Sequence, residues 1–249
     1  MKLKLLACEV LARLVYHLAA VSANTIDIEL VDKGLHSEPD RLRAFLQHRL
    51  DTIEPRRYDA ILLGYGLCSN ALVGLTCAHT QMILPRAHDC ISLFLGSRHR
   101  YAQEFSAKPG TYWYTPDYIE RNGGDTHSIA LGTSSEEYNM TGVYEEYVLK
   151  YGQDNADYLM EVMGAWTEHY DRAAYIDTPE VKLPDYSEDI QRLAERRGWT
   201  MERLAGSLVL LRNLLEGHWG DGDYLVIHPG QTANPSYDSE VVQTVCVAE

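Results

Sequence analysis

A nearly continuous apolar run at residues 58–65 (YDAILLGY) is the feature that most constrains the fold of this chain. Strands that are buried on both faces, inside a parallel sheet, have this pattern. Shorter strand-like segments lie at residues 3–8, 25–31 and 81–84, and amphipathic segments with a helical spacing of apolar residues alternate with them. The alternation predicts βαβ units and a mostly parallel, open, Rossmann-like sheet of the α/β class.

Two helix starts in this part of the chain can be recognised. Ser37 opens a helix that has Pro39 in its first turn, where proline is favoured. A second helix, residues 91–95, is expected to begin at or just after Cys90. Asp89 precedes it and belongs to the residue types that favour the N-cap position.

The second half of the chain has a different organisation. Residues 106–142 are rich in Gly, Pro, Thr, Ser and Asn and enclose an aromatic cluster at 112–114. We expect a long ordered loop or lid there, because loops of that length are uncommon unless they are functional. Beyond it the pattern predicts helices at 144–163, 187–197 and 201–216, and strands at 173–176 and 224–227. We expect one α/β domain over residues 1–249; the alternative has lobes 1–105 and 145–249, joined by the loop-rich segment 106–144.

Charge limits the partners that the chain can have. It has 22 Lys and Arg against 36 Asp and Glu, which gives a net charge of −14. Binding to a nucleic-acid backbone depends on Lys and Arg that displace counterions, and an anionic membrane surface repels the same excess of acid. We therefore expect a cytoplasmic protein that binds neither nucleic acid nor membrane and acts on a small molecule.

The N-terminus imitates a lipoprotein cleavage site, since lysines at positions 2 and 4 precede the segment 5–8 (LLAC). A secretory signal needs about 7–15 apolar residues before the cut, and only a few precede Cys8. The segment is better explained as a first strand. No stretch of the sequence approaches the roughly 20 apolar residues of a transmembrane helix.

Cysteine placement carries the main functional information. Five cysteines are an odd number in a long chain, which does not fit a secreted disulfide framework. Three of them, Cys8, Cys68 and Cys90, follow predicted strands. Ligands of open parallel sheets bind at the carboxyl ends of the strands, whereas structural cysteines usually lie inside elements as small hydrophobes. Cys246, close to the chain end, is expected to be inert.

The loop at residues 64–70 (GYGLCSN) contains two glycines, which allow a backbone to approach a ligand closely. We expect Gly66 and Asn70 to contact a cofactor while the loop presents the thiolate of Cys68. The alternative is an ordinary glycine-rich turn with a buried thiol.

The segment 85–90 (PRAHDC) places four reactive side-chain types together. A helix start at Cys90 would lower the pKa of its thiol through the helix dipole and the unpaired N–H groups. We expect His88 to bind a metal or act as a base, Asp89 to orient a ligand, and Arg86 to meet a carboxylate or phosphate of the substrate. In the alternative, Asp89 caps the helix, His88 is exposed and Arg86 forms a salt bridge.

Thiolates combined with imidazole select zinc or an iron–sulfur cluster. Cys8, Cys68 and Cys90 would fill a four-coordinate site together with His88 or His36. Three thiolates with an open fourth position would suit a catalytic metal, and zinc is favoured because it needs fewer ligands. Asp89, Arg86 and His36 are then the catalytic candidates, although His36 also fits a solvated loop histidine.

Two other groups are weaker candidates. Cys77 and His79 lie in a connection between strands and form a second metal-ligand pair at most. The loop at 228–232 (HPGQT) follows a strand and could hold an anion with its backbone amides, with Gly230 contacting a cofactor. The sequence has no GxGxxG or Walker motif that would support a nucleotide.

Six short motifs in the first 120 residues form a recognisable set: Ala7-Cys8-Glu9, Leu35-His36-x-x-Pro39, Tyr65-Gly66-Leu67-Cys68, Pro85-Arg86-x-His88-Asp89-Cys90, Leu95-Gly96-Ser97 and Pro109-Gly110-Thr111-Tyr112. The set resembles an uncharacterised prokaryotic family, catalogued as domain of unknown function 1638. That family carries no established reaction, and its members occur among anaerobes and methanogens, often near corrinoid-dependent methyltransferases. The resemblance therefore implies a link to one-carbon metabolism and a corrinoid methyltransferase as a partner.

These observations favour a metal-binding enzyme. The metal would act as a Lewis acid, or activate a thiol or methyl acceptor, in one-carbon or methyl-transfer metabolism, as a metal-dependent transferase or lyase. One alternative has no metal: Cys68 and Cys90 face each other as a thiol/thiolate pair, as in cofactor-independent amino-acid racemases. Another is a non-catalytic metallochaperone, or an accessory subunit of a corrinoid methyltransferase.

Overall fold

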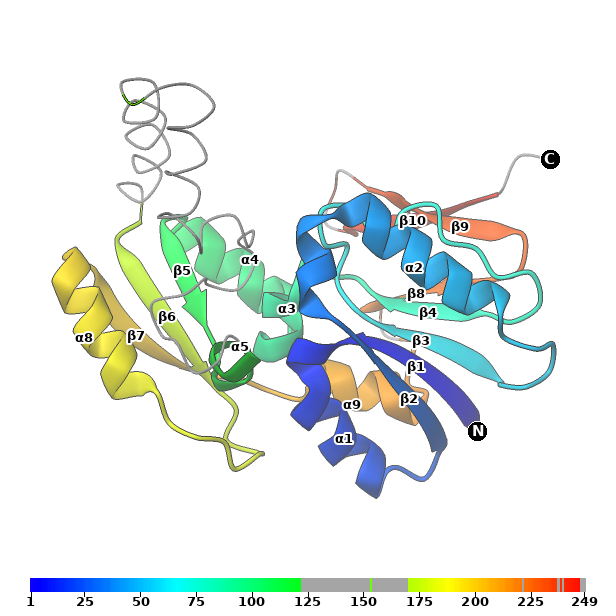
Figure 1. The fold of residues 1–249 in the computed structure, drawn as a ribbon, viewed down its shortest axis with the longest axis horizontal. Coiled ribbons are helices and arrows are strands. Elements are labelled where there is room, and N and C mark those ends of the chain that lie inside the picture. Colours follow the sequence, from blue (N-terminus) through cyan, green and yellow to red (C-terminus); the bar gives the residue numbers. More distant parts are fainter. Residues whose placement is uncertain (122–152, 154–169, 221, 237, 239, 247–249) are drawn as a thin grey trace. The chain divides into compact units, whose positions relative to one another are not determined.

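A five-stranded sheet with the order β2-β1-β3-β4-β8 forms the centre of the part of the molecule that holds the candidate cysteines (Figure 1). Its strands are β1 (Lys2–Cys8), β2 (Thr25–Val31), β3 (Ala60–Gly64), β4 (Met82–Pro85) and β8 (Tyr224–Ile227). The first four are parallel and β8 is antiparallel to β4. The predicted α/β class with a mostly parallel sheet is confirmed.

The structure is a computed structural model that describes residues 1–121, 153, 170–220, 222–236, 238 and 240–246. The chain divides into two compact units. The first comprises Met1–Tyr101, Thr178–Leu183 and Ala205–Glu249, and the second Ala102–Asp177 and Pro184–Leu204. The last segment of the chain thus belongs to the first unit.

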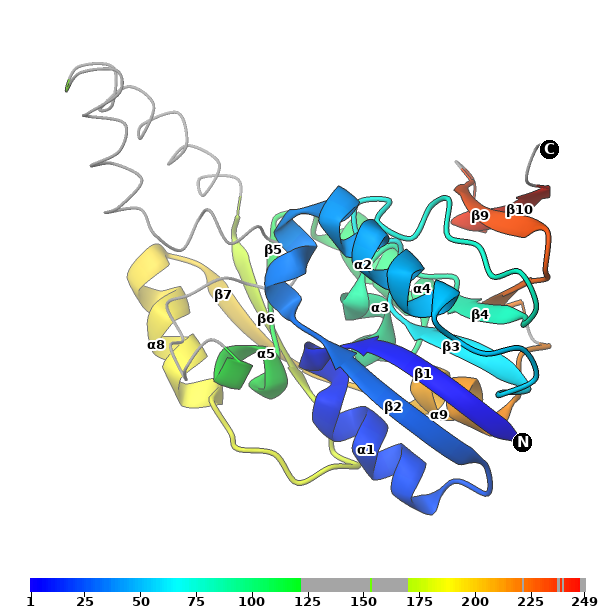
Figure 2. The same ribbon diagram turned by 45° about the vertical axis from the view of Figure 1, so that its right-hand side comes forward.

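Helices cover both faces of the five-stranded sheet. Figures 1 and 2 show α1 (Ala12–Val21) and α9 (Val209–Glu216) on one face and α2 (Pro39–Asp51) on the other. The short helices η1 (Glu9–Leu11) and η2 (Lys33–Ser37) follow β1 and β2, and α3 (Cys90–Leu95) and α4 (Arg98–Ala107) follow β4. Because both faces are covered, β3 is buried throughout, as its apolar sequence predicts, and β1 is buried at Leu3 and from Leu5 to Ala7.

The helix α2 shows how the local sequence sets this packing. Pro39 occupies its first turn, as predicted, and its buried residues Leu42, Leu46 and Leu50 recur every four positions. That spacing places them on one stripe, which packs on Leu6, Ile61 and Leu63 of the sheet. We call this side of the sheet the α2 face.

The order of the strands reverses between β1 and β3. The chain passes from β1 to β2 on one side, then returns past β1 to β3 and β4 on the other. We call the edge at which these parallel strands end the carboxyl edge of the sheet. In open sheets the crevice at such a reversal is the usual ligand site, and here Cys8 ends β1 and Gly64 ends β3 beside it.

The antiparallel strand β8 changes where the last loop lies. Because β8 runs against β4, the loop that follows it leaves from the opposite, amino edge of the sheet. The chain then forms an antiparallel pair, β9 (Gln231–Pro235) and β10 (Val242–Cys246). Figure 2 shows this pair beyond the β4 side of the sheet.

The second unit contains a three-stranded sheet with the order β5-β6-β7. Its strands are β5 (Thr111–Tyr114), β6 (Arg172–Asp177) and β7 (Thr200–Ala205), and its helices include α5 (Pro116–Arg121) and α8 (Ser187–Arg197). β5 and β6 are parallel. Tyrosines and Trp199 dominate its core, in which Tyr112 and Tyr114 are packed.

A buried charge ties this unit together. Arg172 of β6 is 2 % exposed, and its Nη1 lies 2.8 Å from the Glu104 carboxylate and 2.9 Å from that of Glu202. Its Nε donates a hydrogen bond to Thr111 at 2.8 Å. A charge this deep is stable only when it is paired and hydrogen-bonded, as it is here.

Two sequence predictions are wrong in the second half. The segment 106–142 was predicted to be a loop, yet its described part contains β5 and α5; residues 122–142 lie outside the described residues. The predicted helix 201–216 is instead the strand β7 followed by α9. Met, Glu, Arg and Leu favour helices intrinsically, but pairing with the neighbouring strand overrides that preference. The predicted helix 144–163 lies outside the described residues, apart from residue 153.

No helix within the described residues is both long and apolar enough to cross a membrane.

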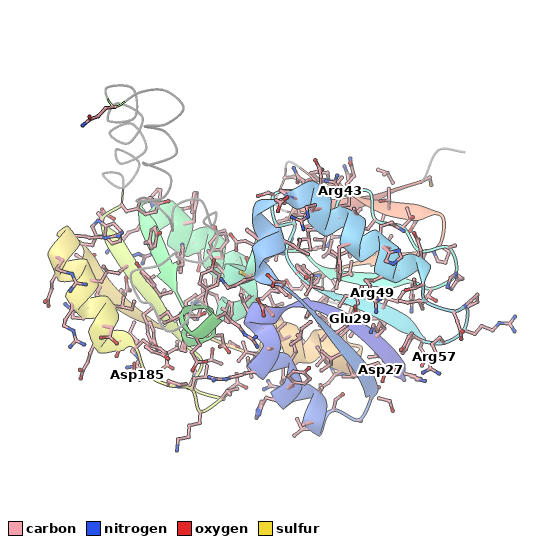
Figure 3. The ribbon with its side chains drawn as sticks, in the orientation of Figure 1. Asp27, Glu29, Arg43, Arg49, Arg57 and Asp185 are labelled. Carbon is pink, nitrogen blue, oxygen red and sulfur yellow. The ribbon has the colours of Figure 1, made fainter. Side chains whose placement is uncertain are left out.

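Replacing Glu29 with glutamine tests an ion-pair group on the α2 face. Glu29 of β2 accepts hydrogen bonds from Arg49 of α2 at 2.9 Å and from Lys4 of β1 at 2.8 Å, and Figure 3 shows Glu29 beside Arg49. Burial raises the pKa of its carboxyl, but these bonds outweigh burial, so the pKa is lowered. Such a group stabilises the fold above its unfolded pKa, and the stability is lost as pH falls through the folded pKa.

We expect Glu29→Gln to reduce the free energy of unfolding by about 1–2 kcal/mol at neutral pH. The difference from the wild type should vanish at a pH below the folded-state pKa of Glu29, as measured by urea unfolding at a series of pH values. Glu188→Gln is the matched control, because Glu188 is 90 % exposed and its pair with Arg192 is 3.8 Å long. Equal losses in the two variants would contradict the prediction.

Candidate functional site

Three cysteines lie at the ends of three neighbouring parallel strands. Cys8 is the last residue of β1, Cys68 follows β3, and Cys90 follows β4. Since β1 pairs with β3 and β3 with β4, all three positions lie at the carboxyl edge. The placement predicted from the sequence is reproduced, and we call Cys8, Cys68 and Cys90 the thiol cluster.

Backbone hydrogen bonds join the two loops that carry Cys68 and Cys90. The amide of Leu67 donates to the carbonyl of Ala87 at 2.8 Å, and the amide of Cys68 donates to that of His88 at 3.0 Å. Gly66 makes this approach possible, because a Cβ there would lie 2.6 Å from the backbone nitrogen of Asp89. Its predicted role was contact with a cofactor; in the structure it allows one loop to pack on the other.

Cys68 begins a run of left-handed backbone. The φ angles of Cys68, Ser69 and Asn70 are +47°, +55° and +64°. Each such residue costs roughly 1–2 kcal/mol unless it is glycine, and asparagine tolerates it best. Strain of this kind gathers at functional sites, where the surrounding structure enforces it. The sequence did not reveal this run, because Cys and Ser carry no preference for it.

The three thiols influence one another. Burial raises the pKa of Cys8 to about 11. Burial also raises the pKa of Cys68, and negative charge on Cys8 and Asp89 adds to the effect. The pKa of Cys90 is raised by burial, then by Asp89, Cys68 and Cys8. Of the three, Cys68 is buried and the other two are partly exposed.

The prediction of a lowered pKa at Cys90 is therefore wrong. Cys90 does begin α3, but that helix is a short one of six residues. Burial and the adjacent carboxylate of Asp89 outweigh what a helix start contributes. The direction of all three pKa shifts favours the thiol over the thiolate.

Asp89 has the capping role that was one of its two predicted roles. Its carboxylate accepts a hydrogen bond from the amide of Ile91 at 2.9 Å, which makes it the N-cap of α3. The hydroxyl of Tyr101 also hydrogen-bonds to it. Burial raises the pKa of this carboxyl despite these bonds. Asp89 therefore fixes the start of the helix that presents Cys90.

Arg86 is engaged by the backbone of distant strands. Its Nε donates to the carbonyl of Tyr224 at 3.3 Å, and its Nη1 donates to the carbonyl of Glu240 at 3.1 Å and to that of Val242. It also pairs with the Glu240 carboxylate at 3.2 Å. This is the salt-bridged alternative of the sequence prediction, and it ties β4 to the segment before β10.

Both candidate histidines are at the carboxyl edge. His88 is exposed, and its backbone carbonyl accepts the hydrogen bond from the amide of Cys68. His36 lies in η2, directly after β2, and is partly exposed. Burial lowers the pKa of His36, so its imidazole is neutral and able to accept a proton or bind a metal.

The remaining candidates lie elsewhere or act through their backbone. Asn70 is exposed, and its carbonyl accepts a hydrogen bond from Arg43 at 2.8 Å. Gly230, with φ +83°, is in the turn after β8 at the amino edge. The ring of His79 hydrogen-bonds to the carbonyl of Ile53, which follows the end of α2. The Cys77–His79 pair therefore lies away from the carboxyl edge and from the thiol cluster. Cys246 is exposed on β10.

Tyr65 is the residue that sequence reasoning missed. It follows Gly64 directly, is 3 % exposed, and belongs to the same apolar cluster as Cys68, against which Cys8 also packs. Its hydroxyl is buried and has no hydrogen-bond partner among the described residues. Burial raises its pKa, and charges on Cys8 and Cys68 raise it further. In the sequence, the position of this tyrosine between two glycines after a buried strand was the feature that could have indicated a functional role.

No group of three or more His, Cys, Asp or Glu side chains, among the residues that the structure describes, is arranged as it would be around a metal ion.

Comparison with known proteins identifies a family and no characterised relative. A family model described as "Protein of unknown function (DUF1638)" matches residues 30–215. The match confirms the resemblance and extends it well beyond the first 120 residues. No curated protein and no solved structure matches the chain.

Substituting Gly66 with alanine should separate the two cysteine loops. The new Cβ would lie 2.6 Å from the Asp89 nitrogen and 2.9 Å from the Ala87 carbonyl oxygen. Both are backbone atoms, so no change of side-chain rotamer can relieve the clash. We expect a loss of about 1–3 kcal/mol in the free energy of unfolding, and faster alkylation of Cys90 by iodoacetamide. Gly220→Ala, with nothing within 4 Å of its new Cβ, should change neither quantity. Unchanged alkylation in Gly66→Ala would contradict the packing described.

Two substitutions at Ser69 test the left-handed turn. With φ at +55°, glycine removes the steric cost of the side chain, and a β-branched valine increases it. We expect Ser69→Gly to leave the free energy of unfolding unchanged or raise it by up to about 1 kcal/mol, because its more flexible unfolded state offsets part of the gain. Ser69→Val should lower it. Equal destabilisation by both in urea unfolding would show that no strain is stored there.

Proposed function

The chain belongs to the DUF1638 family, whose function is unknown, and from the geometry of its carboxyl edge we propose that it binds a thiophilic metal ion through the thiol cluster. The metal-bearing site then acts on a small molecule. The observation that carries the proposal is that Cys8, Cys68 and Cys90 end or follow the neighbouring parallel strands β1, β3 and β4 at one edge of the sheet.

Charge supports a cation at this edge. The charges that act most on Cys68 and Cys90 are negative: the carboxylate of Asp89 and the other thiols when ionised. Lys33 offsets part of this at Cys8 only. A metal ion would supply the positive charge that the cluster lacks, and would let the thiols lose their protons and bind as thiolates.

Donor chemistry favours zinc. Three thiolates satisfy three of the four positions of a tetrahedral zinc site and leave one for a substrate or a further ligand. His88 and His36 are the side chains at the same edge that could take the fourth position. An iron–sulfur cluster commonly takes four cysteines, and Cys77 and Cys246 lie elsewhere in the fold. Closing the thiols around an ion calls for a change of side-chain rotamer at one or more of them.

The chain's own residues then have distinct roles. Gly66 holds the Cys68 loop against the Cys90 loop, and Asp89 fixes the first turn of α3. When bound, the metal would supply Lewis acidity and stabilise a thiolate. An open position at a thiol-rich metal fits transfer or lyase chemistry on a small molecule. The family's association with corrinoid methyltransferases makes methyl transfer the reaction class that we favour.

A metal-free thiol pair is the second candidate. The specific observation in its favour is the direct backbone link between the loops of Cys68 and Cys90. An enzyme of this kind needs one thiolate and one thiol at rest. Since the pKa of both groups is raised, a cation or a substrate charge would have to supply the thiolate.

Elemental analysis of protein purified without oxygen tests the proposal. We expect the wild type to hold a stoichiometric amount of zinc, and Cys8→Ser, Cys68→Ser and Cys90→Ser each to lose most of it, because each removes one of three thiolate ligands. Cys246→Ser and Cys77→Ala are the controls for an exposed and a buried thiol outside the cluster. They should retain the zinc of the wild type.

The outcomes separate the candidates. Substoichiometric metal in the wild type, or equal zinc in all five variants, rejects the metal site. Metal-free protein that exchanges deuterium into the α-carbon of an amino acid, and loses this in Cys68→Ser and Cys90→Ser, supports the thiol pair. Zinc that passes to a purified corrinoid methyltransferase without turnover identifies a metallochaperone.

A further inference from the structure

Tyr65 stands beside Cys8 on the α2 face of the sheet. In the register of β1 and β3, Leu6 pairs with Leu63 and Ala7 with Gly64. One step further along both strands, Tyr65 lies next to Cys8. Side chains alternate along a strand, so Tyr65 shares the α2 face with Ile61 and Leu63, as its membership of that apolar cluster confirms.

The hydroxyl of Tyr65 is buried without a hydrogen-bond partner among the described residues, the thiols included. Leaving a buried hydroxyl unpaired costs free energy, so native structures rarely do so without a reason. Other tyrosines of this chain follow the rule. Tyr224 is also buried and donates its hydroxyl to the carbonyl of Leu210 at 2.5 Å, and Tyr58 donates to Asp27 at 2.7 Å.

We propose that the Tyr65 hydroxyl donates a hydrogen bond to a small, uncharged, oxygen-bearing ligand that lies against Cys8 and Cys68. The inference rests on the proposed function, whose site it extends: Tyr65 is a ligand-positioning residue at the thiol cluster. The three-per-cent exposure of its side chain requires the ligand to be small.

The charges around the site determine which ligands fit. Glu9, Lys33 and Asp32 act on Cys8, and Asp89 acts on Cys68. Three carboxylates outnumber the one ammonium group around the thiols, so a carboxylate or phosphate ligand would be disfavoured. An uncharged ligand with an acceptor oxygen avoids this repulsion and gives the unpaired hydroxyl of Tyr65 a partner.

Titration of the zinc-loaded protein with acetamide tests the inference. This probe is small and uncharged, and its carbonyl oxygen can bind zinc and accept a hydrogen bond. We expect Tyr65→Phe to hold as much zinc as the wild type but to bind the probe about three- to tenfold more weakly in calorimetry, the effect of one neutral hydrogen bond. Acetate, a charged probe of the same size and shape, should bind the wild type more weakly than acetamide does.

Stability without metal gives a second, independent readout. An unpaired hydroxyl contributes nothing to the free protein, so Tyr65→Phe should unfold at the same urea concentration as the wild type or at a higher one. Tyr224→Phe is the matched control. It removes a paired hydroxyl from a buried tyrosine outside the cluster, so it should unfold at a lower concentration and bind the probe as the wild type does.

Each outcome has one meaning. Absence of zinc from both proteins rejects the proposed function. Normal zinc with equal probe affinity in Tyr65→Phe and wild type overturns the role of Tyr65 and leaves the metal site intact. Loss of zinc in Tyr65→Phe, or destabilisation equal to that of Tyr224→Phe, shows that the hydroxyl already has a structural partner and also overturns the inference. Tighter binding of acetate overturns the preference for uncharged ligands.

Discussion

Parallel pairing of β1, β3 and β4 is the constraint on which the candidate site depends. It brings the ends of three strands to one edge, so residues far apart in the sequence, Cys8, Cys68 and Cys90, meet there. Two backbone hydrogen bonds then hold the Cys68 loop against the Cys90 loop, at a distance that only glycine at position 66 allows. The cluster is thus positioned by main-chain geometry, and its side chains remain available for a ligand.

Electrostatics at this edge is unusual for a buried region. Burial and neighbouring acidic groups keep the thiols protonated, and a carboxylate sits within the cluster. Elsewhere in the molecule buried or half-buried charges are compensated: Glu29 by Arg49 and Lys4, and Arg172 by two glutamates. This contrast supports the proposal that a ligand completes the thiol cluster.

The local sequence pattern predicted secondary structure correctly where burial of a segment dictates its sequence. The apolar run at 58–65 correctly predicted β3, and Pro39 correctly predicted the first turn of α2. Asp89 and Cys90 correctly predicted the start of α3. It failed at 201–205, the first part of the predicted helix 201–216, and at 112–114. There, residues with helical or loop-like composition are strands, because pairing with β6 and packing of aromatic rings decide their conformation.

By itself, the sequence determined that this chain is an α/β protein and that three of its five cysteines follow strands. Both follow from local spacing of apolar residues, which records burial. Only the tertiary structure decided the rest. The reversal of strand order placed Cys8 beside Tyr65, the antiparallel β8 removed Gly230 from the site, and distant carbonyls engaged Arg86. Burial, a property of the whole fold, set the direction of the thiol pKa values and left one tyrosine hydroxyl unpaired.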